Sequence, residues 1–236
     1  MANNYFQFKQ FLIHQRYCAM KVTTDACLFG AWVVERVGDC KRVLDIGAGT
    51  GLLTLMVAQK TNDAQIDAVE IDSEAAKEAA TNFKASPWNE RVDLIRENII
   101  KYKVGDLYDF IITNPPFFNN DLKSDSNKRN LAMHSEALSL DELLVSIERL
   151  LKAGGLFAIL LPTHRSVEFE GKALLAGFYL REKVLVKQTP KHPPFRCMLL
   201  FGYEQVMVSE SELVIKENDS YTADFIALLK DYYLYL

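Results

Sequence analysis

The sequence has 236 residues, of which 49% are hydrophobic and 25% are charged, and its formal net charge is −4 at pH 7. This size and composition are typical of one globular α/β domain, and no apolar run is long enough to cross a membrane. The mildly acidic balance argues against nucleic-acid binding through net charge alone, although it leaves room for a local basic patch.

Four cysteines are scattered along the chain, without a CxxC pair and without histidines at the spacing of metal ligands. We therefore expect reduced thiols, a cytoplasmic protein and no metal site. The first residues lack the charged region and apolar core of a signal peptide.

The segment 4–20 combines many aromatic rings with basic side chains that include Lys9 and Arg16. Two interpretations stay open for this segment. It can be a clasp that packs on the domain, or an arm that faces nucleic acid with stacking rings beside cations.

A glycine-rich turn, 47–51, follows a short apolar strand predicted over 41–46. Its glycines let the backbone turn tightly and let a ligand approach the main chain. The helix predicted over 52–60 begins with unpaired N–H groups. Together with Asp45 just before the turn, this strand, turn and helix predict a cofactor site.

A second strand, predicted over 65–70, ends at the acidic residue Glu70. In dinucleotide-binding folds an acid at this place bonds ribose hydroxyls. The glycine spacing here is G-x-G-x-G rather than G-x-G-x-x-G, which disfavours a cofactor with a pyrophosphate group. A third strand, over 91–96, is followed by the polar pair Glu97 and Asn98, where the base of a cofactor can lie.

The stretch Asn114-Pro115-Pro116-Phe117 ends a further strand, predicted over 107–113. Proline cannot continue a central strand, so Asn114 is expected at the carboxyl end, where open α/β sheets carry their chemistry. An amide, carbonyls beside prolines and an aromatic ring suit a flat group with an exocyclic NH₂. The alternative is a rigid turn between strand and loop.

Residues 119–130 form the least apolar stretch of the chain and include Lys128 and Arg129. They predict either a solvated loop or a lid that becomes ordered on an RNA substrate.

The C-terminal half predicts an amphipathic helix over 140–152 that ends at a Gly-Gly pair, then a strand over 156–161. Two further strands, over 179–188 and 195–206, are joined by a link too short for a crossover helix, so they should pair antiparallel. Basic residues gather on this hairpin, among them Lys187, Lys191 and Arg196. They form either a solvated rim or an edge that faces phosphates.

Strands alternate with helices along the whole chain, and no internal repeat is present. The expected fold class is therefore α/β, with a doubly wound Rossmann-like sheet that is mostly parallel and carries a C-terminal antiparallel hairpin.

The motifs at 44–51, 69–70 and 113–117 occur in the order typical of class I S-adenosylmethionine-dependent methyltransferases that methylate amino groups. In these motifs the chain resembles that family. A closer resemblance covers nearly the whole chain, and it is to the bacterial tRNA1(Val) adenine-N6 methyltransferases. The stretches that carry it are 6–11, 18–22, 24–25, 30–32 and 86–88.

The resemblance implies a single domain over 1–236, with an N-terminal segment, 1–24, that contacts RNA and closes over the cofactor, and a catalytic core, 25–236. It implies S-adenosylmethionine as the cofactor. The residues it assigns to the cofactor are Met20, Lys21, Thr23, Thr24, Asp45, Gly47, Gly49, Glu70, Ile71, Asn98, Ile99 and Asn114. Relatives often carry Asp where this chain has Asn98, but an amide oxygen can still accept from the adenine amino group.

The resemblance also implies methyl transfer to N6 of the adenine that follows the anticodon, at position 37 of tRNA1(Val), with Asn114, Pro115 and Phe117 at the target base. Phe117 stands where close relatives often have Tyr. The side chains expected to contact the RNA are Lys9, Arg16, Lys128, Arg129, Lys187, Lys191 and Arg196. We expect a monomer that binds the anticodon loop of the tRNA and binds neither a membrane nor a metal ion.

Two other functions remain open from the motifs alone. An amino methyltransferase with the same motif can act on guanine N2 in RNA, on adenine in DNA or on a protein glutamine, because each presents a planar NH₂. A non-catalytic RNA-binding module is the third possibility, and the glycine turn, Glu70 and Asn114 argue against it.

Overall fold

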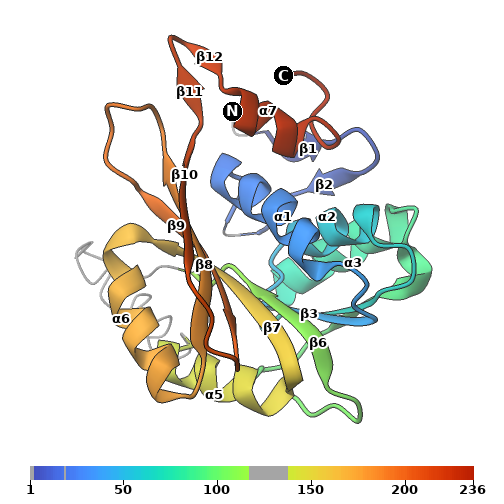
Figure 1. The fold of residues 1–236 in the computed structure, drawn as a ribbon. Coiled ribbons are helices and arrows are strands. Elements are labelled where there is room, and N and C mark those ends of the chain that lie inside the picture. The colour runs from blue at the N-terminus through green and yellow to red at the C-terminus, as the bar shows by residue number, and fades with distance from the viewer. Residues whose placement is uncertain (1–2, 19, 117–137) are drawn as a thin grey trace, which may run out of the picture.

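The computed structural model describes residues 3–18, 20–116 and 138–236 (Figure 1). The helices are α1 (Thr24–Val37), α2 (Leu52–Lys60), α3 (Ser73–Ala85), α5 (Leu140–Leu150), α6 (Thr163–Leu175) and α7 (Ala223–Leu229), with one 3-10 turn at Asn89–Arg91. The strands are β1 (Tyr5–Gln7), β2 (Leu12–His14), β3 (Arg42–Ile46), β4 (Gln65–Val69), β5 (Val92–Ile95), β6 (Tyr108–Thr113), β7 (Leu151–Pro162), β8 (Tyr179–Lys187), β9 (Arg196–Gly202), β10 (Ser209–Val214), β11 (Lys216–Glu217) and β12 (Ser220–Tyr221). No helix in these ranges is long and apolar enough to cross a membrane.

An eight-stranded sheet with the order β10-β8-β9-β7-β6-β3-β4-β5 forms the centre of the fold. Strands β5, β4, β3, β6 and β7 are parallel, β9 is antiparallel to both of its neighbours, and β10 pairs parallel to β8. The predicted α/β class with a C-terminal antiparallel hairpin is confirmed. From β3 the chain builds toward β5 on one side and then toward β7 on the other. Open α/β sheets bind ligands at this kind of switch point, here the carboxyl ends of β3 and β6.

Both faces of the central strands are buried, and alternate residues along a strand point to opposite faces. In β6, Phe110 and Ile112 join one apolar cluster with α1, α2, α3 and α7. Ile111, between them, joins the other cluster with α5 and α6. The two groups of helices lie on opposite sides of the sheet in Figure 1. A sheet covered on both faces explains why its central strands read as continuous apolar runs.

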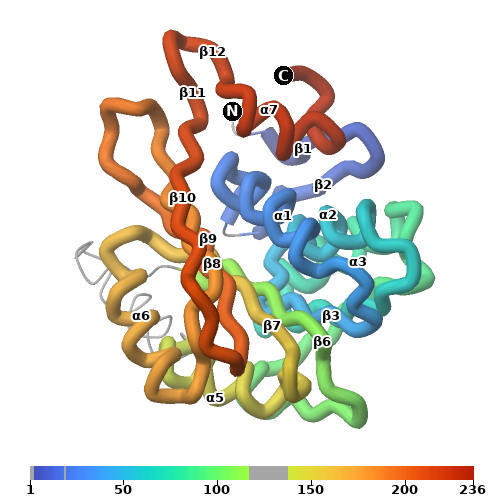
Figure 2. Tube along the Cα trace, viewed as in Figure 1, coloured from blue at the N-terminus to red at the C-terminus, as the bar shows by residue number. Residues whose placement is uncertain are grey.

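The two ends of the described chain pack together over α1, where the blue hairpin β1–β2 and the red helix α7 lie side by side (Figure 2). Phe8 is fully buried and stacks on Phe11 with ring centroids 4.5 Å apart. Phe8 also forms a β-bridge with Tyr233, and the Lys9 N–H donates to the Tyr232 carbonyl at 2.8 Å. The clasp interpretation of the N-terminal aromatics therefore holds for these two Phe rings.

One predicted boundary is wrong. The sequence predicts a helix to residue 152 that ends at Gly154-Gly155, but α5 ends at Leu150 and β7 begins at Leu151. The glycine pair lies inside β7, where the register against β6 shifts and Gly154 has φ 81°. The two glycines therefore mark a bulge in a long strand rather than the end of a helix.

The buried hairpin makes a prediction about stability. Because Phe8 is fully buried, Phe8→Ala should lower the free energy of unfolding by about 3–5 kcal/mol in urea titrations. Tyr5→Ala on the same hairpin removes a half-exposed ring and should change it by about 0.5 kcal/mol or less. Equal effects of the two changes would mean that the hairpin is not part of the cooperative core.

Candidate cofactor and target-base site

The glycine turn after β3 leaves space over its backbone at two positions. Gly47 and Gly49 have positive φ angles of 73° and 57°. Among the described residues, a Cβ on Gly47 would meet nothing within 4 Å, and one on Gly49 would meet only the Cys18 Sγ, at 3.9 Å. At Gly51, by contrast, a Cβ would lie 2.2 Å from Cε1 of Phe83. The first two glycines thus form a cradle for a ligand, and the third allows close packing on α3.

Asp45, the penultimate residue of β3, is fully buried beneath this turn. Its Oδ2 accepts hydrogen bonds from the Thr54 N–H (3.2 Å) and hydroxyl (2.6 Å). Its Oδ1 has no hydrogen-bond partner in the part of the chain that the structure describes. Burial raises the pKa of Asp45 to about 7, with a smaller contribution from the charge of Glu70, against the Thr54 hydrogen bonds. A buried acceptor without a donor suits a ligand with a positively charged amino group.

Glu70 follows β4 and ties the loops after β3 and β4 together. Its Oε2 accepts from the Gly49 N–H at 2.8 Å, and its Oε1 accepts from the Asp72 N–H at 2.8 Å. The carboxylate is buried, whereas the next side chain, Ile71, is half exposed. A fixed acid beside an accessible apolar side chain fits a ribose and the base attached to it.

Asn98 and Ile99 follow β5, the next strand of the sheet. The Asn98 Oδ1 accepts from the Ile100 N–H at 2.9 Å, so its amide is oriented by its own loop and one lone pair of this oxygen is already used. Ile99 is buried, and its carbonyl accepts from Arg149 Nη2 at 2.8 Å. Both residues therefore lie at the same carboxyl edge as Asp45 and Glu70.

On the N-terminal side, the residues before α1 are arranged mainly to hold one another. Lys21 Nζ donates to three carbonyl oxygens of the segment 15–18. Thr23 caps α1, with its hydroxyl accepting from the N–H of the third helical residue at 3.4 Å. Met20 and Thr24 are exposed. Of the four residues assigned to the cofactor here, three already have partners within the protein: Lys21, Thr23 and Thr24, whose side chain is hydrogen-bonded with Tyr233.

Two buried polar residues of α3 that the sequence analysis missed hold this segment, and one of them, Asn82, also contacts the glycine turn. Asn82 Oδ1 accepts from the His14 N–H at 2.8 Å, and its Nδ2 donates to the carbonyls of His14 (3.0 Å) and Thr50 (2.9 Å). Glu78 accepts from two further backbone N–H groups of the segment. Both occupy the apolar face of α3 four residues apart, and that break in the pattern is the signal that could have revealed them.

Asn114 leaves the sheet at the end of β6, beside the glycine turn. Thr113 lies opposite Ile46 in the sheet, and its hydroxyl donates to the Ile46 carbonyl at 2.9 Å. The Asn114 Oδ1 is buried without a hydrogen-bond partner in the ranges 3–18, 20–116 and 138–236, and Pro115 is buried after it. Phe117 lies outside the described residues. An unpaired buried amide oxygen is costly, so its presence here points to a ligand that donates a hydrogen bond.

A family model described as the methyltransferase small domain matches residues 24–169. Relatives match over nearly the full length of both chains, and each is named as a tRNA1(Val) (adenine(37)-N6)-methyltransferase. The one from Dyadobacter fermentans is 46% identical (98% of this chain, 98% of the relative), and the one from Pseudoalteromonas translucida is 39% identical (97% and 98%). The chain belongs to this methyltransferase family.

Solved structures agree with the fold of this methyltransferase. A predicted O-methyltransferase from Agrobacterium tumefaciens superposes with a TM-score of 0.67 at 17% identity (88% of this chain, 96% of that chain). A glycopeptide N-methyltransferase complexed with S-adenosyl-L-methionine superposes with a TM-score of 0.57 at 11% identity (76% and 95%). These distant likenesses confirm the Rossmann-like methyltransferase fold and carry no statement about the substrate.

The basic residues expected to contact RNA lie in two regions of the methyltransferase. Lys9 Nζ donates to the Lys230 carbonyl at 2.5 Å, and the Arg16 guanidinium lies over the Tyr17 ring. On the β8–β9 hairpin, Lys187 pairs with Glu212 and Arg196 with Asp25, both at 2.7 Å, and Lys191 is exposed. Lys128 and Arg129 lie outside the described residues. Several of these cations are thus already bound to other groups of the protein.

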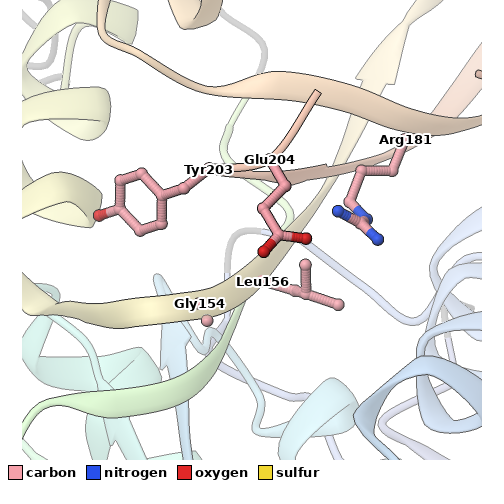
Figure 3. Close-up of a pocket in the computed structure, with 6 residues that line it drawn as sticks. Gly154, Leu156, Arg181, Tyr203 and Glu204 are labelled. Atoms are coloured by element: carbon pink, nitrogen blue, oxygen red, sulfur yellow. The ribbon is translucent and has the colours of Figure 1, made fainter. Parts of the chain in front are cut away.

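A hollow of about 160 Å³ lies near the start of β7, at the end of the sheet opposite the carboxyl ends of β3 and β6 (Figure 3). Its lining residues are Gly154, Gly155, Leu156, Arg181, Tyr203 and Glu204. It is therefore separate from the cradle formed by Gly47 and Gly49. Within the described ranges, no group of three or more His, Cys, Asp or Glu side chains could hold a metal ion.

The close contact at Gly51 gives a testable difference between two glycines. Gly51 and Gly177 have nearly equal φ angles, 80° and 83°, so replacing either by Ala should cost about 1–2 kcal/mol of backbone strain. Gly51→Ala also collides with Phe83, which should add about 1–3 kcal/mol. Urea unfolding without cofactor measures both variants, and equal losses would contradict the packing role of Gly51.

Proposed function

We propose that this methyltransferase transfers a methyl group from S-adenosylmethionine to N6 of adenine 37, the base that follows the anticodon, in tRNA1(Val). The observation that carries the chemistry is the buried Oδ1 of Asn114, which has no hydrogen-bond partner among the described residues and lies at the carboxyl edge of the sheet. The target base is taken from the names of full-length relatives up to 46% identical. An anticodon loop suits the reaction, because a base leaves its stack more easily there than in a duplex.

The described residues fit the cofactor. The free Oδ1 of Asp45 can accept from its amino group, the turn at Gly47 and Gly49 can hold its methionine part, and Glu70 can accept from its ribose hydroxyls. Ile71 can pack on its adenine. The other residues we assign to this site are Met20, Lys21, Thr23, Thr24, Asn98, Ile99 and Asn114. When bound, S-adenosylmethionine supplies an electrophilic methyl group on a sulfonium centre.

At the target base, the chain supplies position and electrostatic stabilisation. The lone pair of an aromatic amine is delocalised into its ring, which makes the amine a weak nucleophile. Hydrogen bonds from its two N–H groups to the Asn114 side-chain oxygen and the Pro115 carbonyl would raise the electron density on nitrogen and offset positive charge in the transition state. Phe117 is assigned to stack on the base. A strong base is not required, since the product amine can release its proton to water.

We further propose one domain over residues 1–236 that acts as a monomer in the cytoplasm and binds the anticodon loop of the tRNA. The segment 1–24 then forms the side of the cofactor site that faces RNA, and residues 25–236 form the catalytic core. Lys191 supports a contribution of the β8–β9 hairpin to phosphate binding, since its side chain is exposed.

Asn114→Ala tests the target-base role. The variant should lose methyl transfer to tRNA, measured with labelled cofactor, while it should still bind S-adenosylhomocysteine, measured by calorimetry. The exposed Asn62, in the loop before β4, provides the matched control Asn62→Ala, which should behave like the unaltered enzyme. Full transfer by Asn114→Ala would remove Asn114 from the mechanism.

The unaltered enzyme identifies the product. With labelled cofactor and total bacterial RNA, mass spectrometry should locate N6-methyladenosine at position 37 of tRNA1(Val). N2-methylguanosine as the product, or methylation of DNA adenine or of a protein glutamine in place of RNA, would support the alternative amino methyltransferases instead.

Asp45 predicts a pH dependence of cofactor binding. The carboxylate must be ionised to pair with an ammonium group, and burial raises the pKa of Asp45 to about 7. Affinity for S-adenosylhomocysteine should therefore level off toward pH 8 and fall as the pH drops through about 7, by up to about tenfold per pH unit. Calorimetry between pH 5.5 and 8 measures this, with Asp45→Asn expected to bind weakly and without the slope. The same slope in both would exclude Asp45 as its origin.

A further inference from the structure

Tyr17 presents an aromatic ring to solvent beside a cation. Its relative exposure is 61%, and the Arg16 guanidinium carbon lies 5.3 Å from the centroid of its ring. A single exposed aromatic residue needs no explanation in itself. What distinguishes Tyr17 is the way in which its backbone is held.

A buried carboxylate fixes this part of the chain. Glu78 of α3, 6% exposed, accepts from the N–H of Tyr17 at 2.7 Å and from the N–H of Cys18 at 2.6 Å. The adjoining carbonyls of Arg16 and Cys18 both accept from Lys21 Nζ at 3.2 Å. Placing a carboxylate in the interior costs free energy that its hydrogen bonds must offset. Here the Glu78 carboxylate holds a surface turn in one conformation, as a preorganised binding surface requires.

The turn borders the cofactor cradle. The Cys18 Sγ, one residue beyond Tyr17, is the atom that a Cβ on Gly49 would meet at 3.9 Å. Asn82 joins His14 to Thr50 of the same glycine turn. Tyr17 is therefore held at the rim of the site over which an RNA substrate must lie to bring its adenine to Asn114.

We propose that Tyr17, supported by Arg16, is a stacking site for a nucleobase of the anticodon loop next to the adenine that enters the Asn114 site. This inference rests on the proposed function. When one base leaves a stack, the face of its neighbour is uncovered, and an aromatic ring at the rim can cover it again. Such stacking is worth about 1–3 kcal/mol per base. The Arg16 guanidinium can then face the phosphate of the same nucleotide.

Binding of an isolated anticodon stem-loop of tRNA1(Val), measured by fluorescence anisotropy with S-adenosylhomocysteine present, tests the proposal. Tyr17→Ala should weaken RNA binding about 5- to 150-fold, the range that corresponds to the stacking energy. Tyr17→Phe and Tyr17→Trp keep a ring and should bind within about threefold of the unaltered enzyme. Tyr235→Ala, which removes an 88% exposed tyrosine near the C-terminus, is the matched control and should have no effect.

Calorimetry with S-adenosylhomocysteine separates stacking from damage to the cofactor site. Tyr17→Ala should keep the cofactor affinity of the unaltered enzyme. If RNA affinity is unchanged in Tyr17→Ala, or if its loss merely follows a loss of cofactor affinity, the proposal is overturned. Neither result touches the proposed function, which fails only if the unaltered enzyme does not form N6-methyladenosine at position 37.

Glu78 should act on RNA through Tyr17 as a positioning residue. Glu78→Gln keeps the side-chain shape but replaces one accepting oxygen by an NH₂ group, which cannot accept from the backbone. We expect a loss of RNA affinity no larger than that of Tyr17→Ala, and no further loss when the two changes are combined. Additive losses would mean that Glu78 affects RNA binding by another route, and would overturn its link to Tyr17.

Discussion

In the register of β3 and β6, Ile46 lies opposite Thr113, so the glycine turn and Asn114 leave the sheet side by side. The proposed site depends on this pairing, because it places the glycine turn and Asn114 at the carboxyl ends of neighbouring strands. Side chains of a strand alternate between faces, so a shift of one residue would exchange the two apolar clusters. The burial of both faces therefore fixes the geometry of the site.

The site contains two buried polar atoms that have no hydrogen-bond partner in the part of the chain that the structure describes. Asp45 Oδ1 and Asn114 Oδ1 are both buried acceptors lacking donors among the described residues. Each such group costs about 1–3 kcal/mol of stability. Two buried clusters on either side of the sheet supply the stability that offsets this loss. A protein of this kind gives up some stability at the site in exchange for groups ready to bind.

The sequence predicted the parts that have local signals. The Pro-Pro break after Asn114, the glycine turn and the acid after β4 all act within a few residues, and they located the ends of β3, β4 and β6. The roles of Glu78 and Asn82 could not be predicted in the same way. Their backbone partners in the N-terminal segment lie about 60 or more residues away in the sequence. The boundary between α5 and β7 falls between Leu150 and Leu151, where neither glycine nor proline separates helix from strand.

The bridge between Phe8 and Tyr233 joins two residues that lie far apart in the sequence. At roughly 5–20 residues per second, the ribosome needs on the order of tens of seconds to pass from one to the other. During that time the hairpin β1–β2 lacks the surface formed by α7, although the strands of the core are already available to pair. The hairpin β1–β2 can therefore reach its final packing only after α7 and Tyr233 have been synthesised.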